Sequence, residues 1–473
     1  MTGPEQTASA RAGQASWAGR RVLVLGAGVS GIAAVRALLQ LGAQVLVADD
    51  RDDVLAEDPS FADQVQLGTV VEIGMPEVLP DVTLVLATPG ASPRHRLLVA
   101  ARRAGIDIIS EPELAWRLRG PQAPPWLVVT GTNGKTTTVG MLESILIADG
   151  RACIATGNIG LPLVEVVTGH VRYDVLAVEL SSFQLDRSPS IRAHAAAVLN
   201  LAPDHLDWHG SMQAYAKAKQ GAFDRAEIAL FNLDEPESGR LAQHHRHAIG
   251  FTVGRPSEGA LGVADGVLLD RAFGDAVELA HLADVTLPGQ HNLANALAAA
   301  GLARSVSAEP AAVATGLRRY LPGPHRNAFI RSVNGVAYVD DSKATNPHAA
   351  KASLSAYSDV VWIAGGLLKG AEVDQLVLAV RHRLRAVVLL GADRAVIAQA
   401  LARHAPDVPV VDVARNDDGA MIEVVRAAAA QARPGSTVLL APAAASMDMF
   451  GNYVARAEAF SRAVAELSQD GPQ

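Results

Sequence analysis

Short apolar runs alternate with glycine-rich turns and longer amphipathic stretches along most of the chain. Residues 22–25, 127–129, 360–363 and 387–390 are such runs, and each leads into a glycine-containing turn. The first two are followed by helix-like stretches at residues 32–41 and 136–148. A strand, a turn and a helix repeated in this way predict parallel sheets with helices on both faces. We therefore expect an α/β protein.

Two proline-rich segments divide the chain, at residues 120–125 and at residues 321–324. A chain of 473 residues is too long for one ordinary core. We therefore predict three domains, residues 1–120, 121–322 and 323–473, with hinge motion at the second linker. The segment from about residue 233 to residue 285 is rich in turns and charges, and its pattern predicts no topology.

Composition and charge mainly exclude certain partners, metal sites and membrane segments. The net charge of −8 provides no basic field for nucleic acid or an anionic membrane. Cys153 is the only cysteine, so one chain can form neither a disulfide nor a cysteine-based zinc site. Residues 1–17 lack the apolar core of a signal peptide, and no apolar run approaches the roughly 20 residues of a spanning helix. We expect a cytoplasmic protein with no nucleic-acid, membrane or obligate protein partner.

The first glycine motif, Gly-Ala-Gly-Val-Ser-Gly at residues 26–31, follows a strand and opens a helix. A second strand at residues 45–47 ends in two aspartates, where an acidic residue would hold a ribose. Alone, this pattern indicates an NAD-dependent oxidoreductase. Glycine-rich amides at a helix N-terminus bind any nucleotide diphosphate, however, and glycines also serve packing alone. The motif therefore leaves the nucleotide open.

The second glycine motif lies between an apolar run and a helix, and it carries the stronger signal. Val129 stands where the usual phosphate loop has its first glycine, but the other parts remain. Gly131 and Gly134 allow backbone amides to surround phosphate oxygens, Lys135 supplies a positive charge, and Thr136 can ligate Mg²⁺. The predicted ATP-binding loop comprises Gly131, Thr132, Asn133, Gly134, Lys135, Thr136 and Thr137.

Three polar clusters follow further apolar runs, where strand ends would place them near this loop. Asn158, Glu179 and His205 are their central residues. Taken singly, Glu179 could lie in a solvated turn and His205 beside a helix cap. Behind a phosphate loop, a carboxylate and an imidazole favour a magnesium site.

Several strings in a fixed order resemble the Mur ligases, the ATP-dependent amide-forming enzymes of peptidoglycan precursor synthesis. The resemblance extends from residue 22 to about residue 467. Its strings are residues 131–137, 157–160 (Gly-Asn-Ile-Gly), 179–184 (Glu-Leu-Ser-Ser-Phe-Gln), 204–207 (Asp-His-Leu-Asp), 289–292 (Gly-Gln-His-Asn), 325–326, 340–346 (Asp-Asp-Ser-Lys-Ala-Thr-Asn) and 441–450. Those at 180–185, 341–346 and 441–450 are similar to the branch that adds D-glutamate.

The resemblance implies three domains with separate ligands. An N-terminal Rossmann-like domain would bind the UDP of UDP-N-acetylmuramoyl-L-alanine. The first glycine motif would then hold this UDP and not NAD. A central P-loop-type domain with a parallel sheet would bind ATP, and a C-terminal Rossmann-like domain would bring D-glutamate. The L-alanyl carboxylate would attack the γ-phosphate to give an acyl phosphate, which the amine of D-glutamate then attacks.

The same resemblance implies a role for each matching residue. The catalytic set is Lys135, Glu179, His205 and Lys219. The UDP-substrate set is Gly28, Val29, Ser30, Asp49, Arg51, Thr88, Pro89 and Gly90, with Asn158 near the acyl phosphate. The ATP set adds Asn292, Asn295, Arg326 and Asp341 to the loop, and the D-glutamate set is Lys343, Thr345, Lys369, Ser446, Met447 and Tyr453.

Two magnesium ions are implied as well, held by Thr136, Glu179, His205 and, if it is carbamylated, Lys219. A carbamate converts the lysine cation into a carboxylate that can ligate a metal. Without the resemblance, Lys219 reads as a surface lysine on a helix. Leu367 and Leu368 depart from the family pattern before Lys369, where an acidic or polar residue is common, and Tyr453 replaces the more frequent phenylalanine.

Other functions remain open at this stage. Another Mur-type ligase or a folylpolyglutamate-type ligase would share the phosphate loop but not the strings around Lys343 and Ser446. An NAD-dependent oxidoreductase would leave that loop without a task. A non-catalytic nucleotide-binding scaffold would not need Lys219.

Overall fold

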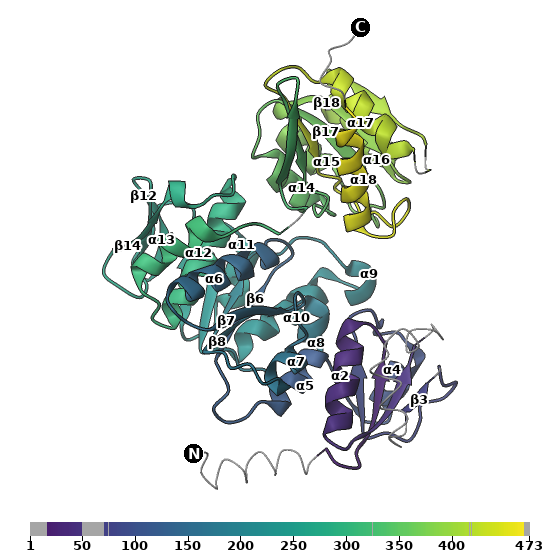
Figure 1. The fold of residues 1–473 in the computed structure, drawn as a ribbon, viewed down its shortest axis with the longest axis vertical. Helices are drawn as coiled ribbons and strands as arrows, with labels where there is room; N and C mark the ends of the chain where they lie inside the picture. The colour runs from purple at the N-terminus through teal and green to yellow at the C-terminus, as the bar shows by residue number, and fades with distance from the viewer. Residues whose placement is uncertain are drawn as a thin grey trace. The chain divides into compact units, whose positions relative to one another are not determined.

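The computed structural model describes residues 17–49, 71–73 (backbone only), 75–323, 325–415, 417 and 419–467, arranged around three sheets (Figure 1). The chain forms two compact units. The first comprises Met1–Leu201, His205–Asp284 and Asn295–Arg319, and the second comprises Ala202–Asp204, Val285–Ala294 and Tyr320–Gln473. Among the described residues, no helix combines the length and the apolar character that crossing a bilayer requires.

The N-terminal sheet has five parallel strands in the order β3-β2-β1-β4-β5. They are β1 (Arg21–Leu25), β2 (Gln44–Ala48), β3 (Val71–Ile73), β4 (Leu84–Ala87) and β5 (Asp107–Ile109), with helices α2 (Val29–Gln40), α4 (Arg96–Arg103) and α5 (Glu111–Leu118). This order is that of a dinucleotide-binding sheet. The predicted first strand and helix are confirmed, and the helix begins three residues earlier than expected.

The central sheet has nine strands in the order β14-β13-β12-β11-β10-β9-β6-β8-β7. They are β6 (Trp126–Thr130), β7 (Cys153–Gly157), β8 (Val175–Glu179), β9 (Ala195–Val198), β10 (Ile228–Asn232), β11 (Ala248–Phe251), β12 (Ala260–Ala264), β13 (Val267–Asp270) and β14 (Val277–His281). Strands β6 to β12 are parallel, whereas β13 and β14 run antiparallel to their neighbours. The expected parallel sheet therefore gains an antiparallel edge, which the segment from residue 233 to residue 285 supplies.

Helices of this central part follow or precede its strands in the α/β manner. They are α6 (Lys135–Ala148), α7 (Leu163–Thr168), α8 (Ser182–Asp186), α9 (Leu206–His209), α10 (Met212–Asp224), α11 (Pro236–Ala242), α12 (Gln290–Ser305) and α13 (Pro310–Arg319), with a 3₁₀ turn at Leu282–Asp284. The predicted helix after the phosphate loop is confirmed as α6.

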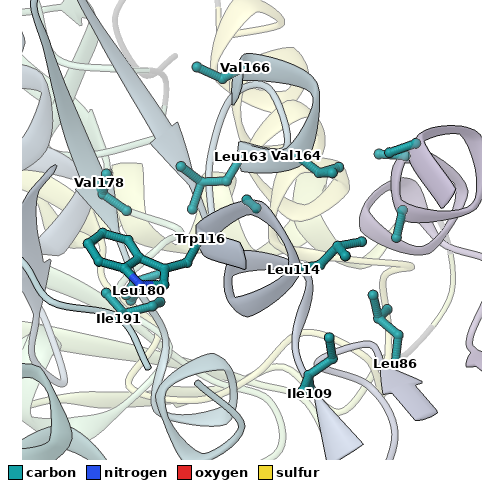
Figure 2. Close-up of a cluster of buried hydrophobic side chains, with 14 of the residues drawn as sticks. Leu86, Ile109, Leu114, Trp116, Leu163, Val164, Val166, Val178, Leu180 and Ile191 are labelled. Atoms are coloured by element: carbon teal, nitrogen blue, oxygen red, sulfur yellow. The ribbon is translucent and has the colours of Figure 1, made fainter. Parts of the chain in front are cut away.

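The N-terminal and central sheets share one buried core. Figure 2 shows Leu86 and Ile109 from the N-terminal sheet near Leu114 and Trp116 of α5, with Leu163 of α7 alongside. Helix α5 packs against α7, and the ring of Trp116 meets that of Trp126 edge-on at 5.0 Å. Because apolar burial stabilises in proportion to its area, this shared core holds the two sheets as one compact unit.

The C-terminal sheet has six strands in the order β15-β16-β20-β17-β18-β19, parallel except for β15 at its edge. They are β15 (Ala328–Val333), β16 (Val336–Asp340), β17 (Val360–Gly365), β18 (Leu384–Leu390), β19 (Val410–Asp412) and β20 (Thr437–Leu440), with helices α14 (Pro347–Leu354), α15 (Asp374–Val380), α16 (Arg394–His404), α17 (Ala420–Gln431) and α18 (Tyr453–Ala465) and a 3₁₀ turn at Arg381–Arg383. Side chains of β17 alternate between two buried cores, so both faces are covered.

Candidate functional site

The phosphate loop joins the end of β6 to the start of α6, as the sequence predicts. Gly134 caps α6 with a left-handed backbone, at φ +86°. A Cβ atom at this position would lie 2.4 Å from the side-chain oxygen of Asn295, so both conformation and space require glycine. Lys135 donates from Nζ to the carbonyl oxygens of Gly131 and Thr132, each at 2.9 Å. The lysine ammonium thus lies inside the loop.

Thr136, Glu179 and Asn158 form one hydrogen-bonded group beside the loop. The Thr136 hydroxyl donates to Glu179 Oε2 at 2.7 Å, and the Asn158 amide donates to Glu179 Oε1 at 2.9 Å. Glu179 ends β8, which pairs with β6, and its side chain is buried. The solvated-turn alternative for Glu179 is therefore wrong. Asn158, predicted to contact the substrate, therefore binds directly to Glu179, which is predicted to hold Mg²⁺.

Lys219 lies on α10 and is buried, so the surface-lysine expectation from the helix pattern is wrong. Its Nζ donates to the Gly131 carbonyl at 2.8 Å and to the Thr130 hydroxyl at 3.4 Å. It also lies 4.7 Å from the centre of the Tyr215 ring, one helical turn earlier. Burial of a lysine ammonium costs free energy, and buried titratable groups of this kind are typical of functional sites.

Two residues outside the predicted set fix the shape of the loop. The Asn200 side chain accepts from the Asn133 amide at 2.9 Å and donates to the Asn133 carbonyl at 3.1 Å. The Tyr215 hydroxyl and the Thr132 hydroxyl share a hydrogen bond of 3.0 Å. Asn200 follows β9, a direct neighbour of β6. A polar residue directly after an apolar run was the signal that could have identified it.

His205 belongs to an aromatic cluster beside the loop. Its ring meets Phe183 edge-on at 4.7 Å, and the Phe183 ring stacks on that of His209 at 5.7 Å. His209 in turn lies 5.2 Å from the Tyr215 ring. Burial, helped by nearby cationic groups, lowers the pKa of His209 to about 4, so that ring is neutral near pH 7. His205 itself is exposed and has a left-handed backbone, at φ +53°.

The oxygens at the phosphate loop fit Mg²⁺, which prefers carboxylate, hydroxyl and phosphate oxygens. The Thr136 hydroxyl and a Glu179 carboxylate oxygen are only 2.7 Å apart, so one ion could contact both. Within the described ranges, no three His, Cys, Asp or Glu side chains group as a metal cluster. A site here would therefore depend on a hydroxyl, on phosphate oxygens or on a modified Lys219.

The first glycine motif forms a tight turn between β1 and α2. Gly28 is the N-cap residue of α2, and Val29 in the first turn is 75% exposed. Asp49, at the end of β2, accepts a hydrogen bond of 2.6 Å from the Ala27 amide. Its carboxylate therefore lies against the glycine turn. Arg51 lies outside the described residues.

Thr88 joins a predicted substrate wall, residues 88–90, to this turn. Its hydroxyl donates to the Leu25 carbonyl at 3.0 Å, and a Cβ atom at Gly26 would lie 2.1 Å from that hydroxyl oxygen. Thr88 is buried, Pro89 is half-buried and Gly90 is exposed. The wall and the glycine turn thus lie together at the carboxyl ends of β1 and β4, and Ser30 lies in the first turn of α2.

In the C-terminal unit, the predicted amino-acid residues gather at the carboxyl ends of neighbouring strands. Lys343 and Thr345 follow β16, Lys369 follows β17, and Ser446 and Met447 follow β20. Leu367 and Ala445 exchange two backbone hydrogen bonds of 2.9 Å, which tie the second loop to the third. The Lys343 ammonium lies 4.0 Å from the centre of the Tyr453 ring. Met447 is 71% exposed.

Asp341 directly follows β16 and lies two residues before Lys343. Burial raises its pKa to about 6, and the hydrogen bonds it accepts and the nearby Arg326 work against that rise. Asn292 of the same unit is buried and donates to the Pro288 carbonyl at 2.8 Å. Asn295, three residues further along α12, belongs to the first unit, in which its side chain lies against Gly134. The two predicted asparagines therefore share one helix.

Comparison with known families gives three matches in the order of the three sheets. A Mur ligase MurD-like N-terminal domain matches residues 20–110, a Mur ligase middle domain matches residues 129–303, and a Mur ligase glutamate ligase domain matches residues 325–444. Each match covers one of the three sheets, although the exact domain limits of 120 and 322 remain predictions.

Curated proteins resemble the chain over almost its full length. The UDP-N-acetylmuramoylalanine–D-glutamate ligase of Thermobifida fusca is 55% identical over 95% of this chain and 99% of that protein. The ligase of the same name from Streptomyces coelicolor is 54% identical, with the same coverage, and that from Mycolicibacterium smegmatis is 45% identical over 94% and 96%.

Solved structures share the fold at low sequence identity. A pseudomurein peptide ligase type C from Methanothermus fervidus has a TM-score of 0.59 and is 17% identical, covering 94% of this chain and 99% of that one. A UDP-N-acetylmuramate–alanine ligase from Thermotoga maritima has a TM-score of 0.56 at the same identity and coverage. These likenesses concern the α/β architecture.

Proposed function

The chain belongs to the Mur ligase family, and from that premise we propose that it joins D-glutamate to UDP-N-acetylmuramoyl-L-alanine. ATP is the co-substrate, converted to ADP and phosphate. The observation that carries the choice of amino acid is the 55% identity to a D-glutamate ligase across 99% of that protein's length. The group formed by Thr136, Glu179 and Asn158 beside the phosphate loop supports the chemistry.

In the first step, the L-alanyl carboxylate of the substrate attacks the γ-phosphorus of ATP, and ADP leaves. Negative charge spreads over the phosphoryl oxygens, so cations and amide donors must be in place beforehand. Lys135 supplies a cation inside the loop, and the left-handed turn at Gly134 leads directly into the first amides of α6. Lys135 and these amides would therefore stabilise the charge that develops while the γ-phosphate passes to the carboxylate.

Mg²⁺ would be held by the Thr136 hydroxyl and the Glu179 carboxylate, with His205 and a carbamylated Lys219 as the remaining proposed ligands. When bound, it would neutralise negative charge on the phosphate oxygens during the transfer. The Asn158 amide keeps Glu179 oriented, since it donates to the carboxylate oxygen that Thr136 does not use.

In the second step, the amine of D-glutamate attacks the acyl-phosphate carbonyl, and the tetrahedral intermediate expels phosphate. D-glutamate carries two carboxylates and must approach an anionic partner, so its pocket needs cations. Lys343 and Lys369 would bind the carboxylates, with the Thr345 and Ser446 hydroxyls as further donors. The two backbone hydrogen bonds between Leu367 and Ala445 support this set, because they tie the loop that carries Lys369 to the loop that carries Ser446 despite the Leu367-Leu368 departure.

The uridine diphosphate would bind at the first glycine turn. The amides that open α2 suit its phosphates, while Asp49 and the wall at residues 88–90 would contact the uridine nucleotide. Arg326, Asp341, Asn292 and Asn295 complete the proposed ATP contacts. The cytoplasmic location, a second magnesium ion and hinge motion near residue 321 also remain proposals.

The test is phosphate release from ATP in the presence of UDP-N-acetylmuramoyl-L-alanine and each candidate amino acid. We expect release with D-glutamate to exceed release with L-glutamate or L-alanine by at least a hundredfold. The product should carry one added glutamate by mass. Equal release with all three amino acids would remove the D-glutamate assignment but leave the family intact.

A further inference from the structure

Arg187 connects three parts of the proposed site. It follows α8, the five-residue helix that begins just after Glu179. Its Nη1 donates to the Thr88 carbonyl at 3.2 Å, and its Nη2 donates to the Ala91 carbonyl at 2.7 Å. Its guanidinium also lies 5.1 Å from the centre of the Trp208 ring, on the short helix that His205 caps. One side chain thus contacts the substrate wall and the surroundings of two proposed catalytic residues.

The wall itself is a tight turn that Arg187 closes. The Ala91 amide donates to the Thr88 carbonyl at 3.0 Å, so the turn spans residues 88–91. Both carbonyls that flank the exposed Gly90 are acceptors for the same guanidinium. A fork of fixed N–H donors holds two acceptors at a set separation, which a single point charge cannot do. The geometry of the wall therefore depends on this arginine.

Neighbouring residues strengthen the same connection between the N-terminal and central sheets. The Ser110 amide donates to the Arg187 carbonyl at 2.9 Å, and the Ser110 and Ser188 hydroxyls share a bond of 2.6 Å. The Ser190 amide donates to Glu113 at 3.0 Å. Residues 187–190 are thus joined to Ser110 and to Glu113 of α5, and the Arg187 side chain adds the hydrogen bonds to the wall.

Stability alone is a poor explanation for this arginine. Its side chain is 3% exposed, and its hydrogen bonds go to carbonyl oxygens rather than to a carboxylate. Its Nε–H is buried without a hydrogen-bond partner among the described residues. Burial lowers the pKa of Arg187 to about 10. Burying a cation in this way costs free energy that an apolar side chain of similar size would not.

We propose that Arg187 is a positioning residue for the uridine-nucleotide substrate, holding the wall at residues 88–90 in a fixed position relative to the Glu179 end of β8. The inference rests on the proposed function, which assigns that wall to the substrate. It leads to a specific expectation, because a loosened wall weakens binding of the uridine nucleotide without changing the phosphate loop. The affinity for ATP should therefore be spared.

The test uses the full chain and calorimetric titration with UDP-N-acetylmuramoyl-L-alanine. Arg187→Met should raise the Kd about tenfold, as loss of two hydrogen bonds implies, while the KM for ATP stays within twofold. Arg187→Lys keeps the charge but not the fork, so its Kd should fall between those of Arg187→Met and the wild type. Amide exchange at Ala91 should accelerate in Arg187→Met, because the turn loses its anchor.

Arg151→Met is the matched control. Arg151 also donates to a backbone carbonyl, that of Val306, at 2.7 Å. It follows the C-terminal end of α6, whereas the phosphate loop precedes the N-terminal end of that helix. It should leave the uridine-nucleotide Kd unchanged. An unchanged Kd in Arg187→Met would overturn the inference, and so would equal losses for ATP and the uridine nucleotide. If Arg187→Met does not fold, the same criteria apply to Arg187→Lys.

Failure of the proposed function is distinguishable from these results. A wild-type protein that binds the uridine nucleotide but shows no D-glutamate-dependent turnover contradicts the function, whereas the positioning role is judged by the ratio of variant to wild-type Kd.

Discussion

Gly134→Ala tests the geometry of the phosphate loop. Gly134 has a φ of +86°, and a new Cβ atom would lie 2.4 Å from the side-chain oxygen of Asn295. Asn295 is 5% exposed, so its amide has little room to withdraw. The left-handed backbone costs alanine about 1–2 kcal/mol, and overpacking adds about 1–3 kcal/mol. We expect a loss of about 2–5 kcal/mol in the free energy of unfolding, together with a KM for ATP raised at least tenfold.

Gly150→Ala separates strain from contact. Gly150 follows the other end of α6 with a φ of +80°, and its new Cβ atom would meet nothing within 4 Å. It therefore loses only the backbone component, about 1–2 kcal/mol, and should leave the KM for ATP unchanged. Urea unfolding gives both stabilities, and initial rates give the KM. In an Asn295→Ala background, the loss from Gly134→Ala should fall close to that from Gly150→Ala, because only the flexible Leu199 side chain, at 3.2 Å, still meets the new Cβ atom. Equal losses for the two glycine variants in the wild-type background would refute the reasoning.

Three further predictions concern ionisable residues. Burial raises the pKa of Glu111 from 4.5 to about 8, so between these values the native state keeps a proton that the unfolded chain has lost, and stability falls as pH rises. Glu111→Gln keeps an acceptor for the Val164 amide and should be a few kcal/mol more stable than wild type in urea at pH 8 but not at pH 4; parallel pH profiles would contradict this. Lys135→Ala should lower turnover at least a hundredfold with an unchanged circular dichroism spectrum, and retained turnover would exclude the loop assignment. Lys219→Ala should lose turnover and recover part of it with added formate or acetate, which could occupy the place of a carbamate; no recovery at any concentration argues against carbamylation.

Local sequence signals predicted the strand–turn–helix units well, including the strand, turn and helix around residues 131–137. The reason is that glycine conformation and apolar periodicity are local properties, so β6, the turn at Gly134 and α6 could be read directly. The ordered strings then indicated the family. The same locality explains why Asn158 and Glu179 were identified as polar residues at strand ends.

Features that depend on long-range burial were not predictable. Lys219 looks like a solvated lysine in its helix, and only the packing of α10 against the β6 loop buries it. The role of Arg187 likewise depends on residues 96 to 99 positions earlier in the chain. The segment from residue 233 to residue 285 supplies β11 to β14, which extend the central sheet through parallel pairs and then antiparallel ones, and these short strands give little periodic signal.

The shared core of the first two sheets was also missed. A proline-rich linker at residues 120–125 suggested separate domains, yet Trp116 and Trp126 pack edge-on across it at 5.0 Å. A linker sequence predicts where the chain bends but not how much apolar surface the flanking elements bury together. Glu111 illustrates the same limit, since nothing local marks it as a buried carboxyl.

The central claim is that the loop at residues 131–137 transfers a γ-phosphate to a carboxylate rather than to water. The most direct measurement uses UDP-N-acetylmuramoyl-L-alanine with both L-alanyl carboxylate oxygens labelled with ¹⁸O, in unlabelled water with ATP and D-glutamate. An acyl phosphate predicts one ¹⁸O atom in each released phosphate and one in the new amide. Phosphate without ¹⁸O, released at the same rate, would show that water is the acceptor and would contradict the account.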